Sequence, residues 1–430
     1  MTPDSGLMKA VETLDYRVTA GDVASQAGLD VKLAEQGLLT LASEAGGHMQ
    51  VSEAGEIAYL FPKNFRSVLQ NKYFRLRVQA WWSKVWQILF YIIRMSFGVA
   101  LVASILLITI AIVLALTALK SAQGDDDDRG FDGGGMAFLP NFWIGPEWYL
   151  IFQPNYYDTR RQRLAGNEPR KLNFLEAVFS FLFGDGNPNA DLAERRWRAI
   201  ATVIRNHGGA VVAEQMAPYL DLPNQLLADD EDYMLPVLIR FNGQPEVSPD
   251  GQIVYHFPEL QVTAAQQRPA AIAAYLKESL WRFSQATSGQ NMLAGGLGAF
   301  NLIGALVLGW LLRNGIAGQL GGLVAFAGGI YGLLLAYGIG FLAVPLVRYW
   351  WIQQRNQKLA AGNERRQQLA ENLNQGGAAL QLKMAYAQQF AAETIVSQDN
   401  LAYSTETDLT DQEVAQSDKI DAEWRKRLER

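Results

Sequence analysis

The sequence contains no cysteine and only three histidines. Without thiolates the chain forms no disulfide and offers no ligands for a cysteine-bound zinc or iron–sulfur cluster. His48, His207 and His256 are far apart, and no HExxH or HxxxH spacing is present. We therefore expect no metal, no cofactor and no catalytic residues, and we predict that the protein is not an enzyme.

Acidic residues are missing from one stretch near the beginning. Residues 63–94 carry seven Lys or Arg and no acid, whereas residues 1–62 carry nine acids and three bases. Basic side chains interleaved with Trp and Tyr beside an apolar run are typical of a membrane–water interface. We predict a basic amphipathic juxtamembrane helix over 63–96 on the cytoplasmic side. The interface residues are Lys72, Arg75, Trp81, Trp82, Lys84, Trp86, Trp350 and Trp351.

Charge is also missing from long apolar runs, which indicates an integral membrane protein. Residues 97–119 are long enough to cross a hydrocarbon core of about 30 Å. Residues 292–347 predict a glycine-rich transmembrane hairpin, preceded by a juxtamembrane helix over 260–291. Small residues recur every four positions in the second half of the hairpin, which favours close helix contact in lipid. The predicted helix-packing residues are Gly328, Gly332, Ala336 and Gly340.

A repeat organises the rest of the chain. Residues 51–62 (VSEAGEIAYLFP) align without a gap with 247–258 (VSPDGQIVYHFP), and 18–29 align with 211–222 in the same order. Two matched blocks in one order indicate a duplicated domain. In each copy we predict three helices and then a two-stranded hairpin turning at Gly55 or Gly251, which is the winged-helix order. The fold class is thus a mainly α membrane protein with two winged-helix-like modules, at 1–62 and 191–259.

The remaining segments connect these parts. We predict an acidic loop over 120–135 and a basic linker with an aromatic helix over 154–190. Residues 136–153 are apolar but hold two prolines and Glu147. They are re-entrant, interfacial or a return crossing, so three or four crossings are open. A polar, largely helical tail covers 348–430.

A winged helix suggests DNA binding, but the charges here oppose it. A recognition helix needs basic or amide side chains toward bases and phosphates. In the first copy that helix has one lysine beside Glu35, and in the second copy the region carries Asp229, Asp230, Glu231 and Asp232. We therefore expect protein partners and no nucleic acid. The predicted partner surface comprises those four acids together with Phe174, Phe179 and Phe183 of the aromatic helix.

One region is distinctive enough for a family resemblance. NFLEAVFSFLFGDGNPNADLAERRW at 173–197, followed by GGAVVAEQMAPYLD at 208–221, resembles a membrane protein family shared by cyanobacteria and plant plastids. Plant members are loosely labelled iron–sulfur cluster biosynthesis proteins, but this chain lacks the cysteines for thiolate ligands. The resemblance implies an oxygenic phototroph and a thylakoid or plasma membrane. It brings no catalytic residue.

These observations favour a non-enzymatic membrane scaffold or assembly factor. The two modules, facing the cytoplasm, hold protein partners such as subunits of a photosynthetic membrane complex. One alternative is a transporter or channel-like protein that uses the glycine-rich hairpin, for which Asn301 and Glu147 are the polar groups. The second alternative is a membrane-tethered transcription regulator, which requires the basic recognition surface that is missing here.

Overall fold

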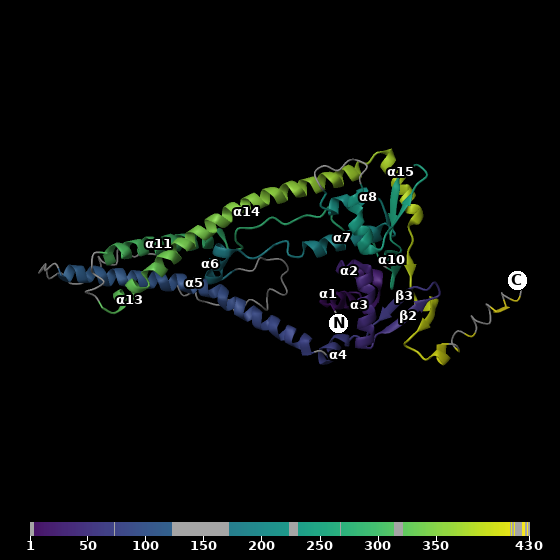
Figure 1. Cartoon of the computed structure of the whole chain (residues 1–430), viewed down its shortest axis with the longest axis horizontal. Coiled ribbons are helices and arrows are strands. Elements are labelled where there is room, and N and C mark those ends of the chain that lie inside the picture. The colour runs from purple at the N-terminus through teal and green to yellow at the C-terminus, as the bar shows by residue number, and fades with distance from the viewer. Residues whose placement is uncertain are drawn as a thin grey trace. The chain divides into compact units, whose positions relative to one another are not determined.

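The computed structural model describes residues 4–72, 74–122, 172–222, 231–266, 268–313 and 321–412, with residues 414, 417, 424, 425 and 428 near the end. The chain is mostly helical with some antiparallel sheet. It divides into two compact units. The head unit comprises residues 1–80, 189–279 and 359–430, and the span unit comprises residues 81–188 and 280–358. Figure 1 shows the elements of both.

The first copy of the repeat forms three helices and a hairpin in the predicted order. Its elements are α1 (Ser5–Thr13), β1 (Arg17–Thr19), α2 (Ala20–Ala27), α3 (Val31–Ala45), β2 (His48–Ser52) and β3 (Ile57–Leu60), followed by α4 (Phe65–Lys72). Thr19 caps α2, and Gly28 ends it in the left-handed conformation. Gly55 makes the hairpin turn with a φ of 87°, which favours glycine.

The second copy repeats this arrangement. Its elements are α7 (Leu192–Asn206), β4 (Ala210–Val211), α8 (Ala213–Met216), η3 (Ala217–Tyr219), η4 (Asp232–Met234), α9 (Leu235–Phe241), β5 (Gln244–Val247), β6 (Ile253–His256), α10 (Pro258–Gln261) and β7 (Val262–Thr263). The two hairpins share one register, because Val51 pairs with Ile57 and Val247 pairs with Ile253. The predicted hairpins are therefore both present.

The two copies share one hydrophobic core, which holds buried side chains from both, including Val11, Leu38, Ile204 and Phe257. Helix α2 and its C-cap pack so closely against the second copy that only glycine fits at two positions, Gly21 and Gly28. A Cβ atom at Gly21 would lie 2.0 Å from the carbonyl oxygen of Glu259, and one at Gly28 would lie 3.0 Å from Cβ of Trp197. The two copies thus pack together as one folded body and are not two separate domains.

The tail completes the head unit. Its elements are the end of α14 (Tyr331–Asn374), α15 (Ala378–Ala387), η5 (Gln388–Phe390), β8 (Thr394–Ile395), η6 (Gln398–Asn400) and β9 (Leu401–Ser404). Strand β9 pairs antiparallel with β2, so the first sheet has the order β1-β3-β2-β9. Figure 1 shows this yellow strand beside the purple hairpin. Strand β8 pairs with β7, and α15 packs against β6.

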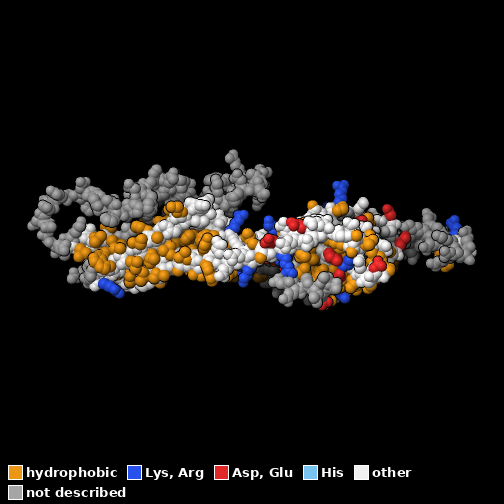
Figure 2. Space-filling model, turned by 90° about the horizontal axis from the view of Figure 1, so that it is seen from above, with side chains coloured by type: hydrophobic (Ala, Val, Ile, Leu, Met, Phe, Trp, Pro, Cys, Tyr) orange, Lys and Arg blue, Asp and Glu red, His pale blue; other side chains and the backbone are white. Residues whose placement is uncertain are grey.

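The span unit contains α5 (Phe74–Ala122, from Trp81 on), α6 (Phe174–Phe183), α11 (Ser288–Arg313), α13 (Leu323–Gly329) and the first part of α14. Three of these helices, α5, α11 and α14, are long and apolar enough to cross a membrane. Hydrophobic side chains cover most of the described face of this unit in Figure 2, with Lys and Arg near its ends. Helix α6 packs among the three through Leu101, Leu175, Leu297 and Phe341.

A polar cluster follows α6 in the distinctive FGDGN motif. Asp185 accepts hydrogen bonds from Arg94 of α5 at 2.7 Å, from the Ser180 hydroxyl at 2.6 Å and from the Gln285 backbone at 2.8 Å. Arg348 of α14 donates to the carbonyl oxygens of Ser180 and Phe181 at the end of α6. A cation at the last carbonyls of a helix is favourable. The motif therefore fixes α6 to both α5 and α14.

Two sequence predictions need correction. The predicted helix over 260–291 is wrong, because the chain between β7 and α11 is irregular. Side-chain amides of α14 replace the helical hydrogen bonds there. Asn363 pairs with both backbone groups of Glu278, and Asn356 pairs with those of Trp281, each at 2.8–2.9 Å.

The juxtamembrane helix and first crossing are not separate elements, because α5 continues without a break from 74 to 122. The described tail is helical up to Phe390, with a break at Gly376-Gly377, and two strands follow. Strand β9 extends the first sheet, and β8 pairs in parallel with β7. The predicted segment 136–153 and the acidic loop to residue 135 lie outside the described residues.

Candidate functional site

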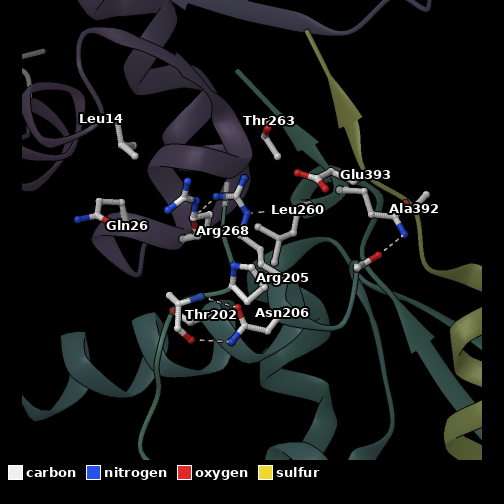
Figure 3. A pocket seen from close by; sticks show the side chains of 15 residues that line it. Leu14, Gln26, Thr202, Arg205, Asn206, Leu260, Thr263, Arg268, Ala392 and Glu393 are labelled. Carbon is white, nitrogen blue, oxygen red and sulfur yellow. Dashed lines mark hydrogen bonds between the residues drawn. The ribbon is translucent and has the colours of Figure 1, made fainter. Parts of the chain in front are cut away.

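A cleft of about 290 Å³ opens in the head unit where four chain segments meet. The first copy contributes Ser25 and Gln26 of α2, and the second copy contributes the end of α7. The chain after β7 and the tail segment before β8 close the other sides. Figure 3 shows the side chains that line it. They are Leu14, Ser25, Gln26, Thr202, Arg205, Asn206, Leu260, Gln261, Thr263, Arg268, Pro269, Ala270, Ala392 and Glu393, with the backbone of Gly208.

Arg205 forms the floor of this cleft and is held by both copies. Its guanidinium donates to the Asp22 carboxylate at 2.6 Å, to the Ser25 hydroxyl at 3.0 Å and to the Leu260 carbonyl at 3.3 Å. The side chains of Asp22 and Arg205 are 3% and 12% exposed. An ion pair this buried is strongly coupled, because removing one partner leaves an uncompensated charge.

Asp22 owes its position to the local sequence. It is the third residue of α2, where its carboxylate accepts from the backbone N–H of the capping residue Thr19 at 3.0 Å. The same oxygen accepts from the Ala264 backbone at 2.9 Å, and the other oxygen takes Arg205. One carboxylate thus caps a helix and joins three segments of the chain.

The other charges of the cleft are Arg268 and Glu393, and its amides are those of Gln26, Asn206 and Gln261. Asn206 is occupied by a two-way pairing with the backbone of Ala270, at 2.9 and 3.0 Å. The arrangement offers a polar surface with both signs of charge. In the described part of the chain no group of three His, Asp or Glu residues is placed to hold a metal ion.

The predicted acidic surface is only partly visible. Asp229 and Asp230 lie outside the described residues, and Asp232 begins η4. Glu231 is engaged inside the head unit. It accepts from the Lys383 ammonium of α15 at 2.6 Å and from the Tyr255 hydroxyl at 2.6 Å. Glu231 therefore binds the tail of its own chain, and an external partner would have to displace that contact.

Lys383 ties α15 to the second copy. Its ammonium also donates to both oxygens of Glu214, at 2.9 and 3.0 Å. Burial lowers the pKa of Lys383, but the hydrogen bonds and charges of Glu231 and Glu214 outweigh it and raise the pKa above 10.5. Burial and the neighbouring Glu231 raise the pKa of Tyr255 as well. The sequence did not predict the cluster of Lys383, Glu214 and Glu231, because no motif surrounds Lys383 in the tail.

The predicted aromatic residues pack on helices of the span unit to different extents. Phe174 is buried in the cluster with Leu101 and Leu297. Phe179 contacts Phe90 and Phe97 edge-on at 5.9 and 5.8 Å, and Phe183 contacts Phe97 at 4.9 Å. Phe183 alone of the three is exposed. Helix α6 thus packs on the apolar helices, so the predicted partner role of Phe174 conflicts with its burial.

The predicted interface tryptophans are exposed. Trp81, Trp82 and Trp86 of α5 and Trp350 and Trp351 of α14 all expose much of their rings, and Lys84 is exposed. Lys72 bonds to Glu44 within the head unit, so it is a structural contact of the first copy. The side chain of Arg75 lies outside the described residues.

Within the described residues, the predicted glycine stripe makes few helix contacts. A Cβ atom at Gly332 or Gly340 would meet no described atom within 4 Å, and Ala336 is exposed. At Gly328 it would make only an ordinary contact with Leu312. Close packing between the described helices occurs at other glycines. A Cβ atom at Gly98 would lie 2.8 Å from Cα of Leu175, and one at Gly298 would lie 2.4 Å from the Phe341 ring.

Comparison with known proteins gives one clear relative. No family model matches the chain, and no solved structure matches it. An uncharacterized chloroplastic protein of Arabidopsis thaliana is 38% identical over 427 residues, which covers 94% of this chain and 79% of the plant protein. Its name places it in the plastid and mentions no iron–sulfur chemistry. The similarity spans both units, and the chain belongs to the same family as this chloroplastic plant protein.

Proposed function

We propose that the protein is a non-enzymatic membrane scaffold or assembly factor whose head unit binds a protein partner of a photosynthetic membrane. The span unit anchors it, and the two modules, which we take as winged-helix-like, present the binding surface. The plastid setting of the plant relative agrees with such a membrane.

The observation that carries this proposal is the chemistry of the third helix of each module. In a winged helix this element faces the bound macromolecule. Here α3 exposes Leu33 and Leu39, at 63% and 56%, and α9 exposes Leu235 and Ile239, at 58% and 65%. The one arginine of α9, Arg240, donates to the Gly28 carbonyl. Aliphatic side chains suit a protein surface, whereas phosphate requires cations.

Membrane insertion rests on α5, α11 and α14, each long and apolar enough to cross. Both modules and the tail belong to one unit, with β9 paired to β2 and Asp22 paired to Arg205. A membrane cannot run through a sheet or an ion pair. We therefore place both modules and the tail on one face, and the basic excess of 63–94 makes it the cytoplasmic or stromal face.

Single-cysteine labelling tests this topology cleanly, because the native chain has no cysteine. Ser43 and Asp250 are exposed, one in each module. Ser43→Cys and Asp250→Cys should react equally with a membrane-impermeant maleimide, and from the same side of sealed vesicles. Labelling of the two variants from opposite sides would refute the shared face.

Partner capture from native membranes tests the scaffold function. The variants are Leu33→Asp with Leu39→Asp on α3, and Leu235→Asp with Ile239→Asp on α9. The matched control is Leu382→Asp, which changes an equally exposed leucine, at 66%, on α15 of the same unit. We expect the helix variants to lose a co-purifying protein that wild type and control retain. Equal recovery by all four, or salt-sensitive binding of the head to duplex DNA, would contradict the proposal.

A second function, transport, is favoured by one observation. Asn301 of α11 is fully buried, and the Ser104 hydroxyl of α5 donates to its side-chain oxygen at 2.8 Å. Its side-chain nitrogen has no hydrogen-bond partner among the described residues. Polar groups at membrane depth often mark a pathway. The described part of the span unit nevertheless packs this pair with apolar neighbours, so helix-to-helix contact explains it better.

A further inference from the structure

An arginine lies against two indole rings at the polar end of the span unit. The Arg355 guanidinium lies 4.9 Å from the Trp281 ring centroid and 5.1 Å from that of Trp351. The two rings meet edge-on, with centroids 5.3 Å apart. The Asn356 side chain fixes Trp281, because it bonds to the N–H and the carbonyl of that residue. The site is therefore built from both the irregular segment and α14.

The hydrogen-bond donors of this site lack acceptors within the described structure. Arg355 makes no hydrogen bond and no ion pair there, and neither does the exposed Arg282 next to Trp281. The indole nitrogen of Trp281 is buried and has no partner. Stacking fixes a guanidinium by its faces and leaves its N–H groups free at the edges. Such a group is oriented for an oxyanion with several acceptor oxygens.

Around Arg355 and Arg282, the described part of the span unit offers positive charge but no carboxylate that is still free to pair. In the described part of the span unit the carboxylates are Glu176 and Asp185. Glu176 is buried at the beginning of α6, where it accepts from the Asn173 backbone. Asp185 is occupied by Arg94, Ser180 and Gln285. Within the described residues of this unit, no acidic side chain is thus available to neutralise Arg355 and Arg282, and an external anion can fill this role.

The position along α14 indicates which anion this is. The uninterrupted apolar run ends at Val347, before Arg348. Trp350 and Trp351 follow, and Arg355 lies about one turn, or about 6 Å, beyond Trp351. Tryptophans mark the level of the lipid headgroups, which extends several ångströms outside the hydrocarbon core. A guanidinium just above them lies at the depth of lipid phosphates.

We propose that Arg355, with Trp281, Trp351 and Arg282, forms a binding site for the phosphate of an anionic phospholipid. Arg355 supplies paired N–H donors to two phosphate oxygens, Arg282 adds charge, and the two indoles hold the guanidinium in place. This proposal rests on the membrane placement proposed above but not on the scaffold function, whose partner surface is in the head unit. A soluble phosphate monoester offers the same oxygens and is the alternative source.

Native mass spectrometry of the full chain, released from nanodiscs, tests the site. Phosphatidylglycerol is compared with a neutral galactolipid of equal chain length. Arg355→Gln removes the charge, and Trp281→Phe keeps a ring but removes the indole N–H. The control is Arg313→Gln, which removes an exposed arginine from the far end of α11. Circular dichroism checks that each variant is folded.

We expect Arg355→Gln to weaken phosphatidylglycerol binding on the order of tenfold, the effect of a lost charge-assisted hydrogen bond. Trp281→Phe should weaken it less, and Arg313→Gln should leave it unchanged. Equal binding by wild type and Arg355→Gln would overturn the site. Equal losses in Arg355→Gln and Arg313→Gln would overturn it as well, by showing general attraction. Displacement of the lipid by millimolar glycerol phosphate would overturn the lipid assignment in favour of a soluble phosphate.

Discussion

The two copies of the repeat have the same hairpin but use its outer edge differently. In the first copy β2 accepts β9, and the bonds outside the ladder run from Met49 N to the Thr405 hydroxyl, at 2.8 Å, and from Glu53 N to the Asn400 carbonyl, at 2.8 Å. The equivalent residues of the second copy are Pro245 and Pro249. Proline has no N–H to donate. We therefore expect these two positions to decide which edge takes the tail strand.

The second copy receives the tail in another way. Helix α15 packs against its sheet, and Lys383 reaches Glu214 and Glu231. The first copy has the matching acid, because Glu35 and Glu231 both stand 16 residues before the valine that begins the repeated hairpin block. No lysine of the tail reaches Glu35 in the described structure. A duplicated fold has therefore diverged in its edges and charges while its core and turns stayed the same.

The largest effect should come from the contact that joins the copies. Asp22→Ala removes a cap and leaves Arg205 buried without its carboxylate, so we expect a loss of about 3–5 kcal/mol in the free energy of unfolding. Gln215 is the equivalent residue of the second copy, and it caps only the Val212 N–H, at 3.0 Å. Gln215→Ala should cost about 1 kcal/mol. Urea unfolding followed by tryptophan fluorescence measures both, and equal losses would show that Asp22 is an ordinary cap.

The tail lysine should have the next largest effect, on the second copy alone. Lys383→Met leaves Glu214 and Glu231 without their cation, which we expect to cost about 2 kcal/mol, less than a fully buried pair because Glu214 is partly exposed. Lys32→Met on α3, an exposed lysine of the first copy, is the control and should change little.

Alkaline pH provides a second readout of the same lysine. The folded-state pKa of Lys383 is raised, so its contribution is complete below the unfolded value of 10.5 and is lost as the pH rises above it. Tyr59 and Tyr255, whose pKa values burial raises above 10.0, add to the alkaline loss in both copies. Stability of Lys383→Met should therefore fall less steeply above pH 10.5 than that of wild type. Parallel curves would contradict the pairing.

Transferring the prolines should convert one edge into the other. Met49→Pro with Glu53→Pro removes two donors to the tail, at about 0.5–1.5 kcal/mol each, and the backbone accepts proline because the second copy has it there. Amide hydrogen exchange at residues 401–404 should speed up at least tenfold, while exchange in β3 stays slow. The control is Pro245→Met with Pro249→Glu, which should leave residues 401–404 unaffected. Unchanged protection in the first variant would mean that side chains, and not the edge donors, hold β9.

Local features of this fold could be predicted from the sequence, whereas long-range contacts could not. Thr19, Gly28 and the hairpin glycines act within a few residues, so α2 and both hairpins follow from local patterns. Asp22 and Arg205 are 183 residues apart, and no sequence pattern near either residue predicts that they pair. The pairing of β9 with β2 does have a signal in the sequence. Only the second hairpin carries prolines at the positions that donate to the tail in the first, so only the first hairpin keeps both donors.

In the span unit, the spacing of small residues did not predict which face of a helix packs against its neighbours. A four-residue spacing places Gly332, Ala336 and Gly340 on one face of α14, but spacing does not say which way the face points. Gly98 and Gly298 are among the glycines that neighbouring helices approach closely, and neither belongs to the stripe. The irregular chain before α11 was also unpredictable, because its backbone bonds go to Asn356 and Asn363, which lie about 80 residues further along.

The smallest expected effect concerns the matching glutamates. Glu35 is exposed on α3 and affects Tyr59 only by its charge, so Glu35→Gln should change the free energy of unfolding by less than about 0.5 kcal/mol. Glu231→Gln removes an ionised acceptor from both Lys383 and Tyr255 and should cost several times more. The double variant Glu231→Gln with Lys383→Met should be less destabilised than the sum of its parts, because both changes disrupt one cluster. Additive losses, or a Glu35→Gln effect as large as that of Glu231→Gln, would mean that the tail does not distinguish the two copies by charge and that packing of α15 alone holds it to the second one.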